Sequence, residues 1–164
     1  NLFGTINTVK AVLPQMRKQK RGRIICISSV AAVYSIPFQA YYSASKAAIN
    51  SFVDALTNEI KSFGIEVTSV MPGDISTGFT AARIKSNAGD DVYSGVIGSA
   101  VSAMEKDEKN GMTPDSVARL VVKLAEKKHV APLYTAGLQY KTLVFLSRLL
   151  PHKLAVKVVG GMYK

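Results

Sequence analysis

Apolar residues recur at helical spacing in two stretches of the chain. In the first stretch they lie three or four residues apart, as Leu2, Ile6, Val9, Leu13 and Met16. The second stretch shows the same spacing from 49 to 63 and ends at Gly64, a residue common at helix C-termini. Because residues three and four apart share one face of a helix, both stretches predict an amphipathic helix with one buried side.

Three short apolar runs predict strands. "RIICISS" at 23–29 is rich in isoleucine and is typical of a strand that is buried on both faces. "IEVTSVMPG" at 65–73 is stopped by its Pro-Gly, and "VAPLYTAG" at 130–137 is expected to be the last strand. Strands that alternate with helices indicate parallel pairing, because parallel neighbours need crossover connections. The predicted fold class is therefore α/β.

The pattern weakens between 74 and 112, where glycines are scattered among small and charged residues. We expect a mobile, partly helical insertion in this segment. Order returns with a predicted helix that has Thr113 as its N-cap, followed by Pro114 and Asp115. The tail, 139–164, alternates apolar clusters with Lys and Arg around Pro151.

Composition indicates one soluble domain over 1–164. The chain is 48% hydrophobic and 20% charged, and its length can bury a core of its own. The only cysteine, Cys26, lies in an apolar run, so we expect a buried thiol, no disulfide and a reducing, cytoplasmic location. No signal peptide opens the chain, and no apolar run reaches the ~20 residues of a membrane span. His129 and His152 have no partner at ligand spacing, so no metal site is expected.

The net charge of +10 is densest in "RKQKRGR" at 17–23. A polyanion site is one interpretation of this run. The run lies between a predicted helix and a predicted strand, however, where cations also favour the C-terminal end of the helix dipole, and no aromatic residues interleave with it. We therefore favour a solvated loop and expect no nucleic-acid partner.

The stretch "SSVAAVYSIPFQAYYSASK" at 28–46 carries the candidate chemistry. Tyr42 and Lys46 are four residues apart and share a helix face. An ammonium in a low-dielectric pocket stabilises a nearby phenolate, which makes a tyrosine usable as an acid or base. Ser28 and Ser29 end a predicted parallel strand at its carboxyl end, where open α/β sheets bind ligands. The Tyr–Lys spacing alone is a weak motif. It becomes informative together with the serines at the end of the predicted strand.

With these residues the chain resembles the C-terminal two-thirds of a short-chain dehydrogenase/reductase. Ser29, Tyr42 and Lys46 match that family's active site in type, order and spacing, and Asn1 corresponds to an asparagine that opens the preceding helix. "PGDIST" supplies the family's loop residues, namely Pro72, Gly73, Ile75 and Thr77. The resemblance implies a partial doubly wound, Rossmann-like parallel sheet with flanking helices and with its first strands missing.

The resemblance also implies a role for each residue. Tyr42 would exchange a proton with the substrate oxygen while hydride moves to or from the nicotinamide. Lys46 would assist Tyr42 and bind the nicotinamide ribose, Ser29 would orient the substrate oxygen, and Asn1 would hold a water linked to Lys46. The loop would fix the carboxamide, and residues 76–112 would form the substrate lid. The implied cofactor is NAD(P)(H), with NADP slightly favoured, although the residues that select it are not in this chain.

One family feature is absent from the sequence. The glycine-rich turn that approaches the dinucleotide pyrophosphate does not occur in these 164 residues. We therefore expect an incomplete copy that binds dinucleotide poorly by itself. Its exposed sheet edge is expected to be covered by another copy, as a homo-oligomer.

The predicted activity interconverts an alcohol and a ketone or aldehyde. The apolar Tyr34, Ile36 and Phe38 suggest a lipophilic substrate. The alternative is a non-catalytic dinucleotide-binding or scaffolding relative. For the tail at 139–164 we favour a pocket cap or a dimer interface, because Pro151 and the 160–161 glycines interrupt a long amphipathic face; peripheral contact with a membrane is the alternative.

Overall fold

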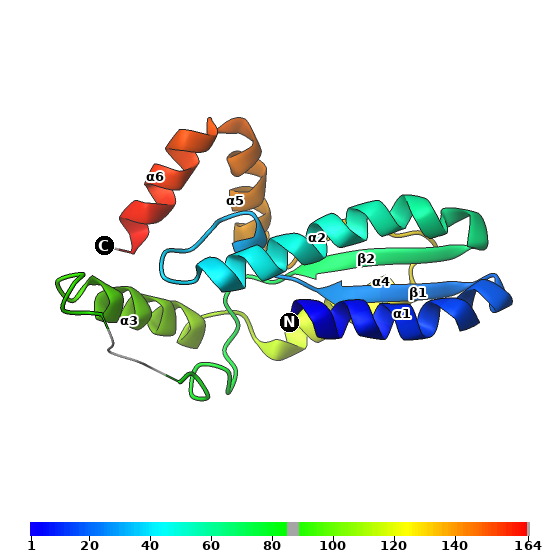
Figure 1. The fold of residues 1–164 in the computed structure, drawn as a ribbon, viewed down its shortest axis with the longest axis horizontal. Helices are drawn as coiled ribbons and strands as arrows, with labels where there is room; N and C mark the ends of the chain where they lie inside the picture. The colour runs from blue at the N-terminus through cyan, green and yellow to red at the C-terminus, as the bar shows by residue number, and fades with distance from the viewer. Residues whose placement is uncertain (85–88, 164) are drawn as a thin grey trace.

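The computed structural model describes residues 1–84 and 89–163 as a parallel sheet with flanking helices (Figure 1). The strands are β1 (Gly22–Ile27), β2 (Ile65–Met71) and β3 (Leu133–Thr135). The helices are α1 (Leu2–Gln19), α2 (Ala40–Ile60), α3 (Val96–Lys109), α4 (Pro114–Glu126), α5 (Leu138–Leu149) and α6 (His152–Met162), with 3-10 turns η1 (Val30–Ala32) and η2 (Lys61–Phe63). The predicted α/β class is confirmed.

All strand pairs in the described part of the chain are parallel, in the order β1-β2-β3. Ile24 of β1 lies opposite Val67 of β2, and Val70 of β2 lies opposite Tyr134 of β3. Each connection crosses over through at least one helix, as parallel pairing requires. The carboxyl ends of the strands therefore meet at one edge of the sheet.

Helices cover both faces of the sheet, because successive strand residues point to opposite sides. Ile24 and Val67 are buried in a cluster with side chains of α1 and α2. Val70 is buried on the opposite face against α4, where Ile25 packs as well. This alternation explains why the strands read as nearly continuous apolar runs.

The predicted helix ends agree with the structure. The helical stretch at 49–63 is the last part of α2 together with η2, and it stops at Gly64 with a φ of 68°. A Cβ at this position would lie 2.5 Å from the backbone oxygen of Lys20, so both the left-handed conformation and the close approach favour glycine. Helix α4 begins after Thr113 with Pro114 in its first turn, as predicted.

Strand β1 differs from the prediction of burial on both faces. Ile24 and Cys26 are buried, but the side chain of Ile27 is 46% exposed. Ile27 ends the strand and lines a cavity, so its side chain lacks a covering helix. Cys26 is a buried free thiol, as expected, and burial raises the pKa of this group.

The basic run at 17–23 is largely not a loop. Its first residues end α1, and Arg23 lies in β1. The Arg23 guanidinium donates to the carbonyl oxygens of Leu124 at 2.8 Å and Ala125 at 3.0 Å, which are at the C-terminal end of α4, and it also pairs with Glu66. One of these cations is thus part of the tertiary structure rather than a solvated charge.

The segment 76–112 leaves the sheet edge and returns to it. The Met112 N–H donates to the oxygen of Asp74 at 2.8 Å, and the Ser76 N–H donates to the oxygen of Met112 at 2.9 Å, which closes the base of the excursion. Within the described part of this segment the one α-helix is α3, so the expected partly helical insertion is present. Residues 85–88 of the predicted lid lie outside the described residues.

Helices α5 and α6 form a hairpin, an inverted V that projects away from the sheet, with the start of α5 next to β3 (Figure 1). Pro151 separates the two helices, as the sequence indicates. Gly160 and Gly161, which are expected to interrupt a long amphipathic face, lie inside α6. The buried Val159 and the cavity-lining Tyr163 anchor this part of the chain and offset the low helix propensity of glycine. No helix in the described ranges is long and apolar enough to cross a membrane.

Candidate active site

A cavity of about 540 Å³ opens beyond the carboxyl ends of β1 and β2. In open parallel α/β sheets this is where ligands bind. Figure 1 shows both strands pointing toward the side where α3 and α6 lie. The cavity is lined by residues from β1, the η1 turn, α2, the loop after β2, the segment 76–112 and the C-terminal end of α6.

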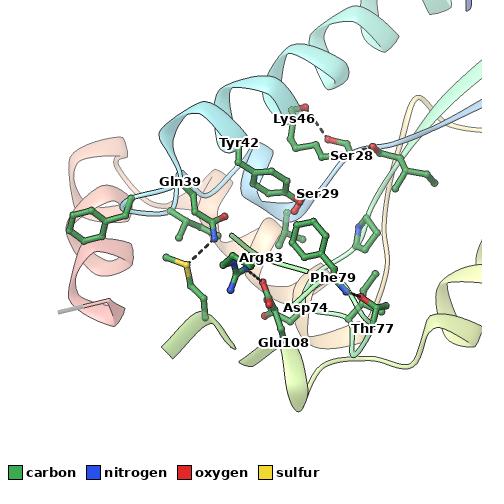
Figure 2. Close-up of a pocket in the computed structure, with 18 of the residues that line it drawn as sticks. Ser28, Ser29, Gln39, Tyr42, Lys46, Asp74, Thr77, Phe79, Arg83 and Glu108 are labelled. Atoms are coloured by element: carbon green, nitrogen blue, oxygen red, sulfur yellow. Dashed lines mark hydrogen bonds and ion pairs between the residues drawn. The ribbon is translucent and has the colours of Figure 1, made fainter. Parts of the chain in front are cut away.

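Tyr42 and Lys46 lie on the same side of α2, and both line the cavity. The Lys46 Nζ atom is 5.7 Å from the centre of the Tyr42 ring. Figure 2 shows that ring pointing from α2 toward Ser29. Their spacing of four residues makes this possible, since it places the two side chains one turn apart. The fold therefore brings an ammonium and a phenol together at a ligand-sized cavity.

The ammonium of Lys46 is held at the end of β1. Only 8% of Lys46 is exposed, and its Nζ donates a hydrogen bond to the backbone oxygen of Ile27 at 3.0 Å. Burial lowers the pKa of this lysine, because desolvation disfavours the charged form. An ammonium has three donors, so the bond to Ile27 leaves capacity for a ligand.

Ser28 and Ser29 end β1 with different partners. Ser28 donates through Oγ to the backbone oxygen of Lys46 at 2.9 Å, which ties the strand end to α2. The Oγ of Ser29 accepts the Ala31 N–H at 3.1 Å and caps the η1 turn. Both serines are buried and line the cavity. Ser28 is thus engaged between backbone elements, whereas the Ser29 hydroxyl still has its own proton to donate.

The loop after β2 borders the cavity with the predicted Pro72, Gly73, Ile75 and Thr77. Ile75 forms a parallel bridge to Met112, so the loop is held from the far side by the returning segment. Thr77 is exposed, and its Oγ1 accepts the Phe79 N–H at 3.2 Å. Hydroxyl and backbone groups are thereby presented beside the Tyr–Lys pair.

A tyrosine that the sequence did not indicate holds this loop. The Tyr140 hydroxyl, from α5, donates to Oδ2 of Asp74 at 2.8 Å and accepts the Asp74 N–H at 3.0 Å. Burial is the main reason that the pKa of Asp74 is raised, and the nearby Asp107 and Glu108 add to this effect. Tyr140 lies 66 residues from Asp74, so no local pattern connects them.

A charged cluster lines the other side of the cavity (Figure 2). Arg83 forms an ion pair with Glu108, and the Thr80 hydroxyl donates to Glu108 at 2.6 Å. Arg83 also lies 3.7 Å from Glu105. No sequence pattern indicates this cluster, because its members come from a segment without clear periodicity and from α3.

The remaining wall is largely apolar. Ile36, Phe38, Phe79 and Met104 line the cavity. Phe38 has a φ of 60°, a rare conformation for a bulky residue, and its ring packs edge-on against Tyr93. A contact between the α2 side of the cavity and the segment 76–112 thus shapes this wall. Of the three residues that suggest a lipophilic substrate, Ile36 and Phe38 border the cavity, whereas the Tyr34 hydroxyl donates to the Leu143 oxygen of α5.

The fold brings most of the predicted site residues to one cavity. Those that line it are Ser29, Tyr42, Lys46, Pro72, Gly73, Ile75 and Thr77. Asn1 is exposed at the start of α1 and is not among the lining residues. His129 has no expected partner at ligand spacing. Its Nδ1 lies 3.1 Å from Oε1 of Glu66, outside the cavity.

A second tyrosine–lysine pair shows that the pair alone is not the site. Lys127 donates to the Tyr134 hydroxyl at 2.9 Å, outside the cavity. The Ala131 N–H and then Lys127 lower the pKa of Tyr134. What distinguishes Tyr42 is the combination of Lys46, Ser29 and a cavity large enough for a ligand.

The donor set of the cavity can bind a polar cofactor beside an apolar substrate. The Lys46 ammonium and the Tyr42 hydroxyl can bind ribose hydroxyls, and the loop at 72–77 offers backbone groups and a threonine hydroxyl to an amide. These groups fit the nicotinamide end of a dinucleotide. Bound there, such a cofactor would supply the hydride, while the protein would supply the proton and the positioning.

A family model described as short chain dehydrogenase matches residues 1–88. Among curated proteins, 3-ketodihydrosphingosine reductase of Bacteroides thetaiotaomicron is 42% identical over 131 residues, which are 79% of this chain and 49% of that protein. Dehydrogenase/reductase SDR family member 7B of Xenopus laevis is 38% identical over 151 residues, which are 92% of this chain and 43% of that protein. The chain spans about half the length of the curated relatives it matches.

Solved structures have the same fold. A short chain dehydrogenase from Burkholderia cenocepacia in complex with NADP has a TM-score of 0.71 at 21% identity, covering 96% of this chain and 55% of that chain. A 3-oxoacyl-[acyl-carrier protein] reductase with bound NAD from Brucella melitensis has a TM-score of 0.60 at 28% identity, covering 84% of this chain and 47% of that chain.

Proposed function

We propose, since the chain belongs to the short-chain dehydrogenase family, that the full-length protein is an NAD(P)(H)-dependent oxidoreductase that interconverts a lipophilic ketone and its alcohol. One observation carries this proposal. Tyr42, Lys46 and Ser29 come from two different elements and line one cavity at the carboxyl edge of the sheet.

In this mechanism Tyr42 is the proton donor for ketone reduction. Its hydroxyl gives a proton to the substrate oxygen, and it takes the proton back when the alcohol is oxidised. The buried ammonium of Lys46 stabilises the phenolate that is left, because a positive charge in a desolvated site acts strongly at short range. Ser29 donates its hydroxyl hydrogen to the substrate oxygen and orients it.

The dinucleotide would be held by groups of this chain at its nicotinamide end. Tyr42 and Lys46 would bind the ribose, and the loop containing Pro72, Gly73, Ile75 and Thr77 would bind the carboxamide. Asn1, which is exposed at the start of α1, would hold a water linked to Lys46. NADP is the slightly favoured form and is to be compared with NAD in the same assay.

The proposed substrate is a long-chain ketone. The apolar wall formed by Ile36, Phe38, Phe79 and Met104 suits an alkyl chain, and the segment 76–112 would act as the lid over it. Because the Bacteroides relative is a 3-ketodihydrosphingosine reductase, that ketone is the first compound to test, beside a short-chain ketone for comparison.

The test is the variant Tyr42→Phe in the full-length protein. We expect kcat for ketone reduction to fall roughly 100- to 10,000-fold, because the proton donor is removed while the ring remains. Oxidation of NADPH or NADH is followed by absorbance. Dinucleotide binding, measured by fluorescence, should change far less than turnover.

Tyr134→Phe is the matched control, because it removes a lysine-bonded tyrosine hydroxyl outside the cavity. Its turnover should stay close to that of the unchanged protein. Equal activity of Tyr42→Phe and Tyr134→Phe would refute the proposed mechanism. A protein that binds dinucleotide and turns over none of the ketones or alcohols offered would support the non-catalytic alternative.

A further inference from the structure

The hairpin of α5 and α6 carries an apolar surface that no other described residue covers. On α5, Leu138, Phe145 and Leu149 are 81%, 61% and 65% exposed. Their spacing of seven and four residues places them along one face of the helix. Tyr140 and Val144 on the opposite face are buried. Helix α5 therefore has one apolar side that packs and another that faces solvent.

Helix α6 also carries exposed apolar side chains. Leu154, Val158 and Met162 are spaced by four residues and exposed, whereas Val159 packs inward. Pro151 joins the helices at the apex of the inverted V in Figure 1. The apex thus presents Leu149 and Leu154 on either side of the proline.

Cations surround these apolar side chains without any acidic residue. From 138 to 163 the sequence contains Lys141, Arg148, Lys153 and Lys157 and no Asp or Glu. All four cations are exposed. An exposed apolar tip with basic neighbours is complementary to a lipid bilayer, which has anionic headgroups at its surface and apolar acyl chains beneath them.

We propose that the hairpin tip, residues 148–154, inserts into the surface of a bilayer that contains anionic phospholipid. Leu149 and Leu154 would enter the boundary between headgroups and acyl chains, while Arg148 and Lys153 bind lipid phosphates. This contact is peripheral and needs no membrane-spanning helix.

A second copy of the chain fits this surface less well. A two-fold contact through the tips would place Arg148 and Lys153 opposite the same cations, and the chain already has a net charge of +10. An anionic bilayer supplies the opposite charge together with an apolar layer.

The hairpin also borders the cavity. Tyr163 lines the cavity just after α6, and the Tyr34 hydroxyl donates to the Leu143 oxygen of α5. The hairpin would therefore link a membrane-bound tip to the wall of the cavity.

Flotation of the full-length protein with vesicles tests the proposal and needs no enzymatic activity. One set of vesicles contains phosphatidylcholine with about one-third phosphatidylserine, and the other contains phosphatidylcholine only. We expect flotation with the anionic vesicles, weakened by high salt. Arg148→Gln with Lys153→Gln should lower partitioning about thirtyfold. Leu149→Ser with Leu154→Ser should lower it about tenfold.

Two controls match these changes. Arg119→Gln with Lys123→Gln removes the same charge from exposed sites on α4. Leu138→Ser alters an exposed leucine about 16 Å of helix away from Leu149. Both controls should float like the unchanged protein. No flotation with anionic vesicles, or equal flotation of tip and control variants, would overturn the proposal. Conversion of a dimer to a monomer by the tip variants, with vesicle binding unchanged, would assign the surface to a second copy instead.

Discussion

At the scale of single residues, the cavity contains groups whose protonation depends on burial. Burial lowers the pKa of Lys46 and raises the pKa of Asp74, because each charged form loses hydration. A hydrogen bond to the Ile27 oxygen replaces part of the hydration that Lys46 loses. The Tyr140 hydroxyl does the same for Asp74. These side chains are therefore held in place at some cost in stability, as is common at functional sites.

Asp74→Asn should make stability less dependent on pH. The pKa of Asp74 is raised in the folded protein, so the folded state holds the proton more tightly than the unfolded chain. As pH rises through the window above the ordinary aspartate value, the folded state must release that proton and loses stability. The variant should therefore be more stable than the unchanged protein at neutral pH, and the difference should vanish at about pH 3.

Urea denaturation at both pH values measures this difference. Asparagine can still accept the Tyr140 hydrogen bond, so packing is retained. Asp54→Asn, which removes one carboxylate from an exposed site on α2, is the matched control. A variant that is less stable at neutral pH than at acid pH, relative to the unchanged protein, would contradict the argument.

At the scale of elements, α5 clamps the loop after β2. A Cβ on Gly73 would lie 2.1 Å from Cζ of Tyr140, so the ring occupies the space of a side chain at residue 73. The same tyrosine bonds both the backbone and the carboxylate of Asp74. The C-terminal hairpin thus determines the position of a loop that is proposed to bind the cofactor.

Gly73→Ala should destabilise the protein by roughly 1–3 kcal/mol, because the ring of Tyr140 is held and cannot move away freely. Combined with Tyr140→Ala, it should cost less than the sum of the two single changes, since the smaller residue frees the space. Thermal or urea denaturation of the three variants provides the double-mutant cycle.

Gly78→Ala is the matched control, because a Cβ there meets nothing within 4 Å. It should shift the free energy of unfolding by no more than about 0.5 kcal/mol. The proposed clamp would be refuted if Gly73→Ala were tolerated as well as Gly78→Ala. It would also be refuted if the destabilisation of the double variant equalled the sum of the two single variants.

At the scale of the whole molecule, the described sheet carries the groups that are proposed to hold one end of a dinucleotide. The cavity holds the groups proposed for the nicotinamide, but the sequence contains no glycine-rich turn for the pyrophosphate. Strand β1 also lies at the edge of the described sheet. The complete site is therefore proposed to need chain outside residues 1–164.

Residues 1–164 alone should bind NADPH about a hundredfold more weakly than the full-length protein, a difference of about 2.7 kcal/mol. Fluorescence titration of both proteins measures the two dissociation constants, and circular dichroism checks that the shorter one keeps its helices. Equal affinity of the two proteins would show that the 164 residues contain the whole binding site.

The sequence by itself determined the order of the three strands and of α1, α2 and α4, together with some of their ends. Periodicity marked α1, α2 and α4, apolar runs marked the strands, and Gly64 marked a helix end, because these signals arise from neighbours within a few residues. The Tyr42–Lys46 pair was also predictable, since a spacing of four places two side chains on one helix face.

Only the tertiary structure decided which further residues, distant in the sequence, meet at the cavity and at the loop beside it. Tyr140 reaches Asp74, and Arg83 reaches Glu108, across separations of 66 and 25 residues that carry no sequence pattern. The structure likewise distinguishes Tyr42 from Tyr134. Both tyrosines lie near a lysine, but only Tyr42 lines the cavity. Local spacing sets which side of its own element a residue occupies, whereas packing between elements sets what that side meets.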